Sequence, residues 1–232
     1  MIGIIAAMDK ELNALIERVE DARSETVSGI RFTKGTLDRT PVVCAVCGIG
    51  KVNAAVCAQT MILRYGPDVL INTGVGGALS PSLKVCDVVL GEYAVQHDVD
   101  TSALGDPVCM VSTVNVVRFP MDEGTVSALE ECMKEMELKP LRAGIATGDR
   151  FVSEEADKRR IRDLTSCSVC EMEGAAIAQV CYLNHVKCAV LRSVSDGADD
   201  GAPMSYLEFA DKAAHINVEV LTRYLKSLSE NC

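Results

Sequence analysis

Residues 168–196 read SVCEMEGAAIAQVCYLNHVKCAVLRSVSD, and this stretch predicts a strand, a helix and a second strand in succession. We expect the strands over residues 168–172 and 187–195 and the helix over residues 174–185. Strands that alternate with helices are typical of a mostly parallel sheet covered by helices. The stretch therefore predicts an α/β fold.

The rest of the chain repeats this alternation. Residues 1–7 are a continuous apolar run that predicts a strand, and apolar residues then recur at helical spacing from Met8 to Val19. Residues 30–37 and 41–47 alternate as a hairpin. The further expected strands lie at 68–73, which the glycine-rich GVGGAL follows, at 85–96, near 111–117 and at 142–147, and the further helices at 51–65, 122–137, 154–164 and 205–228. This order predicts a mostly parallel, helix-covered sheet in a single domain over residues 1–232.

The composition excludes several classes of protein. The chain has 23 Lys and Arg against 33 Asp and Glu, a formal charge of −10, whereas nucleic-acid binding requires a basic surface. Its longest apolar stretches, such as 86–90 and 187–191, are far shorter than the roughly 20 residues that span a bilayer. We therefore expect no nucleic-acid partner and no membrane partner.

The cysteines favour a reducing cytoplasm. There are eleven, an odd number, and several lie in apolar strand-like runs where a thiol behaves as a small hydrophobic group. The motifs CAVC at 44–47 and CSVC at 167–170 place thiols three residues apart on predicted strands, so the thiols of each pair point to opposite faces. No metal site is expected from them.

Polar residues at the ends of the predicted strands are the first candidates for a site, because ligands of open α/β sheets bind beyond the carboxyl ends of the strands. The segments concerned are Met8 to Glu11, Gly48 to Lys51, Thr73 to Ala78, Gly148 to Val152, Glu171 to Glu173, and Arg192 to Asp196. A charge that interrupts or ends a buried strand requires partners, so Arg192 and Asp196 are expected to face a polar site.

Each of these candidates also has a purely structural interpretation. Glu173 is also consistent with an acid that stabilises a helix N-terminus, and Arg192 with Asp196 is also consistent with a structural ion pair. Glu11, taken alone, is more typical of a helix surface. The glycines at 48–50 and 74–76 lack the third small residue of a dinucleotide fingerprint, and no triphosphate-binding loop is present, so neither a dinucleotide site nor a triphosphate site is expected.

Seven motifs together resemble one family. In order they are IGIIAAMDKEL, CGIGKVNAA, INTGVGGAL, HDVDTSALG, TGDRFV, CEMEGAAIAQVC and LRSVSDGAD, and they run from the first strand to the final helix. The set resembles the 5'-methylthioadenosine/S-adenosylhomocysteine nucleosidases of the nucleoside phosphorylase superfamily. The resemblance implies a three-layer α/β/α fold around a central mixed, twisted sheet, a homodimer, and hydrolysis of the N-glycosidic bond to adenine without a metal or cofactor.

The resemblance also implies roles for individual residues. Asp196 matches the general acid at adenine N7, Glu11 matches the carboxylate that activates the attacking water, and Arg192 matches the partner of that carboxylate. Glu173 matches the acid that binds the ribose hydroxyls, with Met172 beside the sugar. The remaining substrate contacts implied are Phe151 stacked on adenine, the Val152 backbone at the base edge, Ile49, Val75 and Gly76 in the glycine segments, and Met8 and Tyr206 as apolar walls.

Departures from the family pattern leave alternatives open. Val75 stands where better-known members carry Ser, and Leu104 and Asp106 stand where they often carry aromatic residues at the 5'-substituent. A nucleosidase for another 5'-modified adenosine, such as aminofutalosine, is therefore a further possibility. A purine nucleoside phosphorylase is less consistent with the sequence, because the first strand–helix turn offers Lys10 but no Arg for phosphate. A nucleoside-binding module without catalysis is the weakest alternative, since all three carboxylates are present.

Overall fold

The computed structural model describes residues 1–197 and 202–230, and these form strands and helices in close alternation. The helices are α1 (Asp9–Ile16), α2 (Lys51–Tyr65), α3 (Glu123–Glu135), α4 (Glu155–Thr165), α5 (Gly174–Asn184) and α6 (Ala202–Glu230), with one 3-10 turn at Ser102–Leu104. The strands are β1 (Ile2–Ala6), β2 (Glu20–Val27), β3 (Ile30–Leu37), β4 (Thr40–Val46), β5 (Val69–Ala78), β6 (Val88–Gln96), β7 (Phe119–Pro120), β8 (Leu141–Thr147), β9 (Cys167–Glu171) and β10 (Lys187–Asp196).

The strands form one mixed sheet. Strand β1 pairs in parallel with β4 and β5, and β5 pairs in parallel with β10. Antiparallel pairs join β10 to β6, β5 to β9, and the successive strands β2, β3 and β4. Because β10, β6, β8, β9 and β5 pair in turn and β5 pairs again with β10, that half of the sheet closes on itself.

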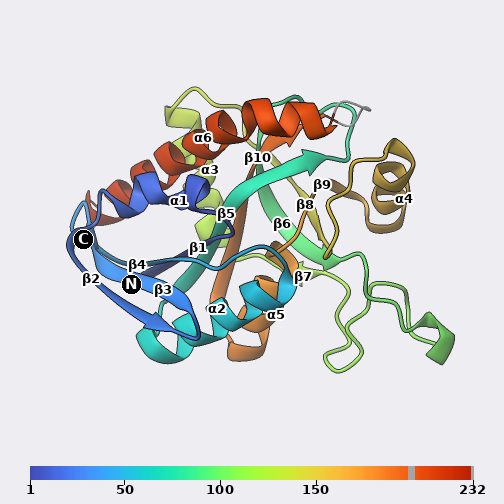
Figure 1. Cartoon of the computed structure of the whole chain (residues 1–232), viewed down its shortest axis with the longest axis horizontal. Helices are drawn as coiled ribbons and strands as arrows, with labels where there is room; N and C mark the ends of the chain where they lie inside the picture. Colours follow the sequence, from blue (N-terminus) through green and yellow to red (C-terminus); the bar gives the residue numbers. More distant parts are fainter. Residues whose placement is uncertain (198–201, 231–232) are drawn as a thin grey trace.

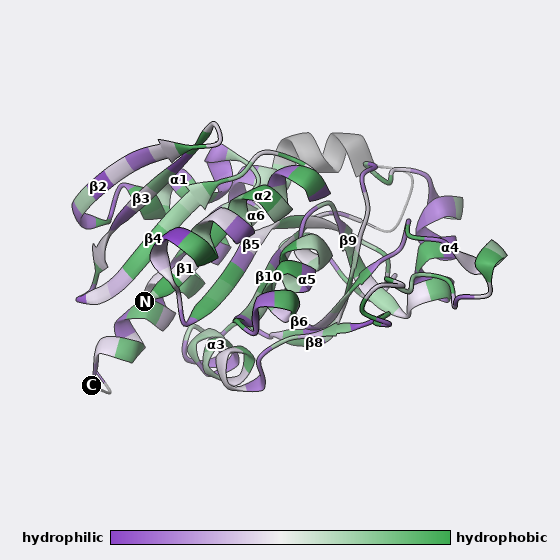
Figure 2. Cartoon of the chain, turned by 90° about the horizontal axis from the view of Figure 1, so that it is seen from below, coloured by the Kyte–Doolittle hydropathy of each residue, from purple (hydrophilic) through white to green (hydrophobic). Residues whose placement is uncertain are grey.

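Helices cover both faces of the sheet, as the three-layer prediction requires (Figure 1). One apolar cluster packs α1, α3 and α6 against side chains such as Ile4, and a second packs α2 and α5 against side chains such as Ile5. Successive strand residues point to opposite faces, so neighbours in β1 belong to different clusters. Hydrophobic colour is concentrated at the centre of Figure 2, in β5, β10 and α5, whereas α4 carries more hydrophilic colour at the edge.

Four details differ from the sequence prediction. The sheet is mixed, as the family resemblance implies, rather than mostly parallel, as the alternation of strands and helices alone predicts, partly because short turns force β2, β3 and β4 into antiparallel pairs. Strand β2 was not expected, since its residues are polar and exposed. The glycine-rich run 74–77 extends β5 beyond the predicted strand end at residue 73 and pairs with β10. The strand expected near 111–117 is wrong: only an isolated bridge joins Val111 and Val116, and the next strand is β7.

None of the helices within residues 1–197 and 202–230 is both long and apolar enough to cross a membrane.

A buried asparagine fixes α6 to the sheet. The Asn217 side chain accepts a hydrogen bond from Ser193 Oγ of β10 at 2.7 Å and donates one to the Gly74 carbonyl of β5 at 2.7 Å. Both partners lie beside the strand ends that carry polar candidates. One side chain therefore ties the last helix to the two strands at the centre of the sheet.

We expect Asn217→Ala to lower the free energy of unfolding by about 1–3 kcal/mol, because it leaves buried polar groups of Ser193 and Gly74 without partners. Urea denaturation measures the change. Asn13→Ala, at an exposed position of α1, is the matched control and should stay within about 0.5 kcal/mol of wild type. Equal stabilities of the two variants would contradict this interpretation of Asn217.

Candidate active site

The ends of several strands enclose a cavity of about 510 Å³. The lining comes from the loop after β1, from β5, from the segment after β9 and from the end of β10, with Phe151 from the segment after β8. Segments far apart in the sequence thus meet at one edge of the sheet.

Most of the residues predicted from the sequence meet at this cavity. Its lining includes Met8, Glu11, Ile49, Val75, Gly76, Phe151, Met172, Glu173 and Asp196. Val152 lines a smaller adjoining cavity, which shares Phe151, Met172 and Asp196. Arg192 lies behind the lining rather than in it. The side chain of Tyr206 lies outside the described part of the chain.

Glu11 is a buried acceptor of three backbone N–H groups. Its side chain is in the first turn of α1, where Ala7 N and Met8 N donate to Oε2 at 3.1 and 2.9 Å and Val75 N donates to Oε1 at 3.0 Å. Only 3% of the residue is exposed, so its interpretation as a surface acid is wrong. Burial raises the pKa of Glu11, although the three N–H groups and the charge of Arg192 oppose this effect.

Glycine at position 74 makes room for this carboxylate. A Cβ atom at Gly74 would lie 2.8 Å from Glu11 Oε1, which is closer than real Cβ contacts allow. Gly77 has the same relation to Asp196, whose Oδ2 would lie 2.8 Å from an added Cβ. The glycine-rich end of β5 therefore lets two carboxylates approach the strand from neighbouring elements.

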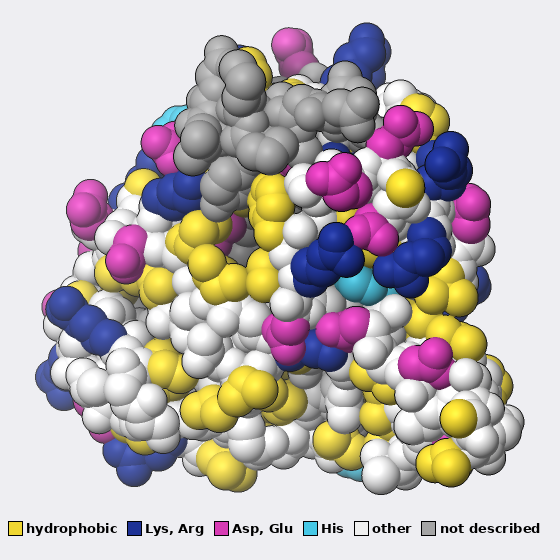
Figure 3. All heavy atoms as spheres, turned by 45° about the vertical axis from the view of Figure 1, so that its right-hand side comes forward, with side chains coloured by type: hydrophobic (Ala, Val, Ile, Leu, Met, Phe, Trp, Pro, Cys, Tyr) yellow, Lys and Arg dark blue, Asp and Glu magenta, His cyan; other side chains and the backbone are white. Residues whose placement is uncertain are grey.

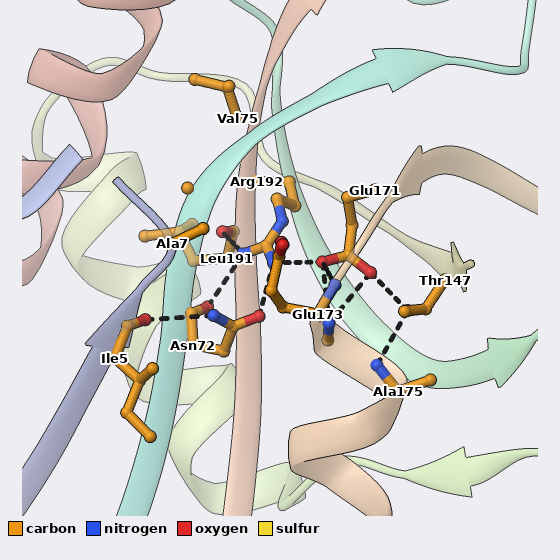
Figure 4. Close-up of polar contacts among 12 residues, drawn as sticks. Ile5, Ala7, Asn72, Val75, Thr147, Glu171, Glu173, Ala175, Leu191 and Arg192 are labelled. Atoms are coloured by element: carbon orange, nitrogen blue, oxygen red, sulfur yellow. Dashed lines mark hydrogen bonds and ion pairs between the residues drawn. The ribbon is translucent and has the colours of Figure 1, made fainter. Parts of the chain in front are cut away.

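Arg192 is the centre of a buried polar cluster behind the cavity (Figure 4). Its guanidinium forms an ion pair with Glu171 and also donates to the side chain of Asn72. Nη1 donates to the carbonyls of Leu191 and Asn72 at 3.0 and 3.3 Å. The alternative of an Arg192–Asp196 ion pair is wrong, because a register shift between Val194 and Asp196 turns the strand end toward other partners.

Glu171 links this cluster to the start of α5. Its carboxylate accepts the backbone N–H groups of Glu173 and Gly174 at 3.0 Å and shorter, and the hydroxyl of Thr147. A carboxylate at this position satisfies the otherwise unpaired N–H groups of the first helical turn. The side chain that caps the helix is thus Glu171, and Glu173 is free to point elsewhere.

Glu173 points into the cavity, where its Oε1 accepts the N–H of Gly50 at 2.8 Å. Burial and, next, the charge of Glu171 raise the pKa of Glu173 to about 7, against the opposing charge of Arg192. The interpretation of Glu173 as a solvated helix-terminal acid is wrong, since only 6% of the residue is exposed.

Asp196 ends β10 at the other side of the cavity. Ser195 Oγ donates to its Oδ1 at 2.8 Å, and Lys158 Nζ of α4 contacts its Oδ2 at 3.2 Å. Lys158 also donates to the Gly197 carbonyl. Burial raises the pKa of Asp196, whereas the hydrogen bond from Ser195 and the ammonium of Lys158 act in the opposite direction.

Sequence reasoning missed several members of this arrangement. Asn72 and Ser195 lie in predicted strands and carried no signal beyond being polar there. Glu171 was noticed as a strand-end carboxylate but received no role. Lys158 belongs to a helix whose sequence, EADKRRIRDLT, is typical of a solvated surface, so nothing in the pattern marks it as buried.

The described residues include no group of three or more His, Cys, Asp and Glu placed to hold a metal ion.

On the face shown in Figure 3, acidic and basic side chains lie interspersed, with no large area of one charge sign.

Comparisons with known proteins show the family of the chain. Residues 1–228 match the phosphorylase superfamily. The chain is 36% identical to the 5'-methylthioadenosine/S-adenosylhomocysteine nucleosidase of Shewanella halifaxensis, with 98% of this chain and 99% of the relative covered. The chain belongs to this nucleosidase family. The nucleosidase of Bacillus thuringiensis is 37% identical over the same shares.

Solved structures place this nucleosidase near two kinds of enzyme. A Neisseria meningitidis 5'-methylthioadenosine/S-adenosylhomocysteine nucleosidase in complex with methylthio-immucillin-A superposes with a TM-score of 0.94 at 34% identity, covering 97% of this chain and 98% of the other. A futalosine hydrolase of Helicobacter pylori superposes with a TM-score of 0.93 at 32% identity, covering 97% of each chain. The protein is an enzyme of this nucleosidase group, and the predicted fold class is confirmed.

We expect Glu173→Gln to raise the free energy of unfolding at pH 8 by about 1–3 kcal/mol and to change it little at pH 4.5. The Glu173 carboxyl has a pKa of about 7 in the folded nucleosidase, and an unfolded glutamate ionises near pH 4.3. As the pH rises between these values the unfolded state ionises first, so this group lowers stability up to about pH 7. An amide cannot ionise and avoids that loss.

Urea denaturation at both pH values measures this difference. Glu17→Gln, at the exposed C-cap of α1, is the matched control and should follow wild type throughout. A Glu173→Gln variant no more stable than wild type at pH 8 would rule out the raised pKa.

Proposed function

We propose that the enzyme hydrolyses the N-glycosidic bond of 5'-methylthioadenosine and S-adenosylhomocysteine, releasing adenine and the 5'-thio-ribose. The observation that carries this proposal is that one cavity is lined by buried carboxylates from two separate elements, Glu11 and Asp196, with Glu173 beside them. Cleavage of an N-glycoside requires activation of water on one side of the sugar and protonation of the base on the other. The names of the relatives support adenine nucleosides as the substrate class.

On the water side, Glu11 is the general base. A raised pKa brings a carboxylate closer to the operating pH, where it accepts a proton from water more readily. The three backbone N–H groups fix the side chain, and Arg192 supplies a positive charge nearby. Water then attacks C1' of the ribose as the bond to the base breaks.

On the leaving-group side, Asp196 is the general acid at N7 of adenine. Departure of adenine as an anion is slow unless the base is protonated. Phe151, which is 46% exposed, stacks on the base, and the backbone of Val152 binds its edge. Both residues line the smaller cavity together with Asp196, which supports binding of the base in that part of the site.

The ribose lies between these two ends. Its oxocarbenium-like transition state carries positive charge, which the carboxylate of Glu173 stabilises while accepting hydrogen bonds from the hydroxyls. Met172 packs beside the sugar, and Met8, Ile49, Val75 and Gly76 complete the wall. No cofactor takes part. No Lys or Arg occurs among the described residues that line the 510 Å³ cavity, which favours water over phosphate as the nucleophile.

A nucleosidase for another 5'-modified adenosine, such as aminofutalosine, is the second candidate. Its support is the superposition with a futalosine hydrolase, which is as close as that with the nucleosidases. The two candidates share the reaction at C1' and differ at the 5'-substituent. Comparing kcat/KM for methylthioadenosine and for aminofutalosine discriminates between them.

We expect Asp196→Asn and Glu11→Gln each to lower kcat by about 10²- to 10⁴-fold while adenine binding stays within a few-fold of wild type. Each variant removes a proton-transfer group and keeps its shape. Adenine release followed by absorbance, with calorimetric titration of adenine, measures both quantities. Asp163→Asn, on the exposed face of α4, is the matched control for full activity. A rate within tenfold of wild type in either variant would exclude the role assigned to that residue.

We also propose that the enzyme is a homodimer through α2 and α5, which pack side by side. These helices expose large apolar side chains, with Val52, Leu63 and Leu183 between 54% and 75% exposed. Exposed apolar surface of this kind is typical of subunit interfaces. Sedimentation should give a dimer for wild type and for the control Leu164→Glu on α4, and a monomer for Val52→Glu. A monomeric wild type would overturn the proposal.

A further inference from the structure

A buried lysine contacts the residue proposed as the general acid, and the mechanism above does not use it. Lys158 comes from α4 and is 2% exposed, although lysine is among the residue types least often buried. Its ammonium lies 3.2 Å from Asp196 Oδ2, donates to the Gly197 carbonyl, and lines the smaller cavity with Phe151 and Val152. The sequence of α4 is typical of a solvated surface, and such a helix does not need a buried ammonium group beside Asp196.

The contact conflicts with a simple acid role for Asp196. A general acid has to carry a proton when the substrate is bound, whereas an ammonium beside a carboxylate favours the ionised form. Burial acts in the other direction and favours the uncharged form. Lys158 and Asp196 therefore form a buried pair in contact, across which one proton can move.

We propose that Lys158 is a positioning residue that supplies, through Asp196, the proton delivered to the leaving base. This inference rests on the proposed hydrolysis and extends it at the same site. A desolvated pair of opposite charges is costly, and its neutral form, a carboxylic acid beside an amine, differs only in the position of one proton. Binding of the base over Phe151 excludes further water and favours that neutral form.

The proton transfers balance. An Nζ–H bond of Lys158 breaks as an Oδ2–H bond forms on Asp196, which leaves a neutral amine. The Asp196 proton then forms an N7–H bond as the C1'–N9 bond breaks and its electron pair goes to the base. Water adds to C1' and gives a proton to Glu11. Return of that proton through solvent restores the ammonium, so one water is consumed and no other reagent is required.

The other charged and titratable groups around the pair have partners or are uncharged. In β9, Glu171 forms an ion pair with Arg192. The neighbouring Cys170 thiol is neutral, because burial raises the pKa of Cys170. Arg150, from the segment after β8, pairs with Asp157 at 2.6 Å. Among the described residues, Lys158 is thus the cation that contacts Asp196 directly.

The test is the pH dependence of kcat/KM for adenine release from methylthioadenosine in Lys158→Met and Lys158→Arg. Without the lysine, only an Asp196 that is itself protonated can act, so Lys158→Met should keep near-wild-type activity at low pH. Above the Asp196 titration its activity should fall about tenfold per pH unit, while wild type stays flat to higher pH. Lys158→Arg keeps the charge but cannot release a proton, so it should be about 100-fold slower than wild type at neutral pH and should regain activity only at low pH, where Asp196 itself is protonated.

Arg160→Met removes an exposed cation of the same helix and should match wild type. Thermal unfolding checks that each variant is folded. A Lys158→Met profile that coincides with wild type, or full activity in Lys158→Arg, would overturn the proposal and leave the hydrolysis intact.

If wild type itself releases no adenine, the proposed function fails, and the proton coupling is tested separately. Carbon NMR titration of the Asp196 carboxyl, assigned with Asp196→Asn, should then show a higher midpoint in Lys158→Met than in wild type. An unchanged midpoint would overturn the coupling.

Discussion

The buried ion pair between Arg192 and Glu171 is the contact on which the rest of the site depends. It joins β10 to the end of β9, and the same guanidinium donates to the side chain of Asn72 in β5. A buried pair is not in itself a large source of stability, but removal of either partner leaves a charge without compensation. Because Glu171 also caps α5, the pair sets where that helix begins and leaves Glu173 directed into the cavity.

The two proposed proton-transfer groups lie in environments of different kinds. Backbone N–H groups surround Glu11, whereas a hydroxyl and an ammonium contact Asp196. Divergent surroundings of this sort are how one site carries a base and an acid at a single pH. Both carboxylates approach β5 at a glycine, Gly74 for Glu11 and Gly77 for Asp196, so a side chain at either position would displace one of them.

Local pattern predicted most of the fold, and long-range contacts account for what it missed. Apolar periodicity placed α1 and α3 close to their observed limits, and residues 30–47 formed the expected hairpin. The sequence pattern did not predict strand β2, because its residues are polar throughout. It did not predict the end of β5, because glycines usually mark turns. The cavity lining followed from strand ends, but the partners of Arg192 and the burial of Lys158 depend on contacts between distant segments, which no local pattern records.

Water is the expected nucleophile, because Glu11 is held at the cavity and no Lys or Arg occurs among the described residues that line its 510 Å³ volume. The most direct measurement is the initial rate of adenine release from methylthioadenosine with and without added phosphate, with the sugar product identified by mass spectrometry. Equal rates and a free 5-methylthioribose are predicted. A rate that requires phosphate, with a sugar 1-phosphate as product, would contradict hydrolysis.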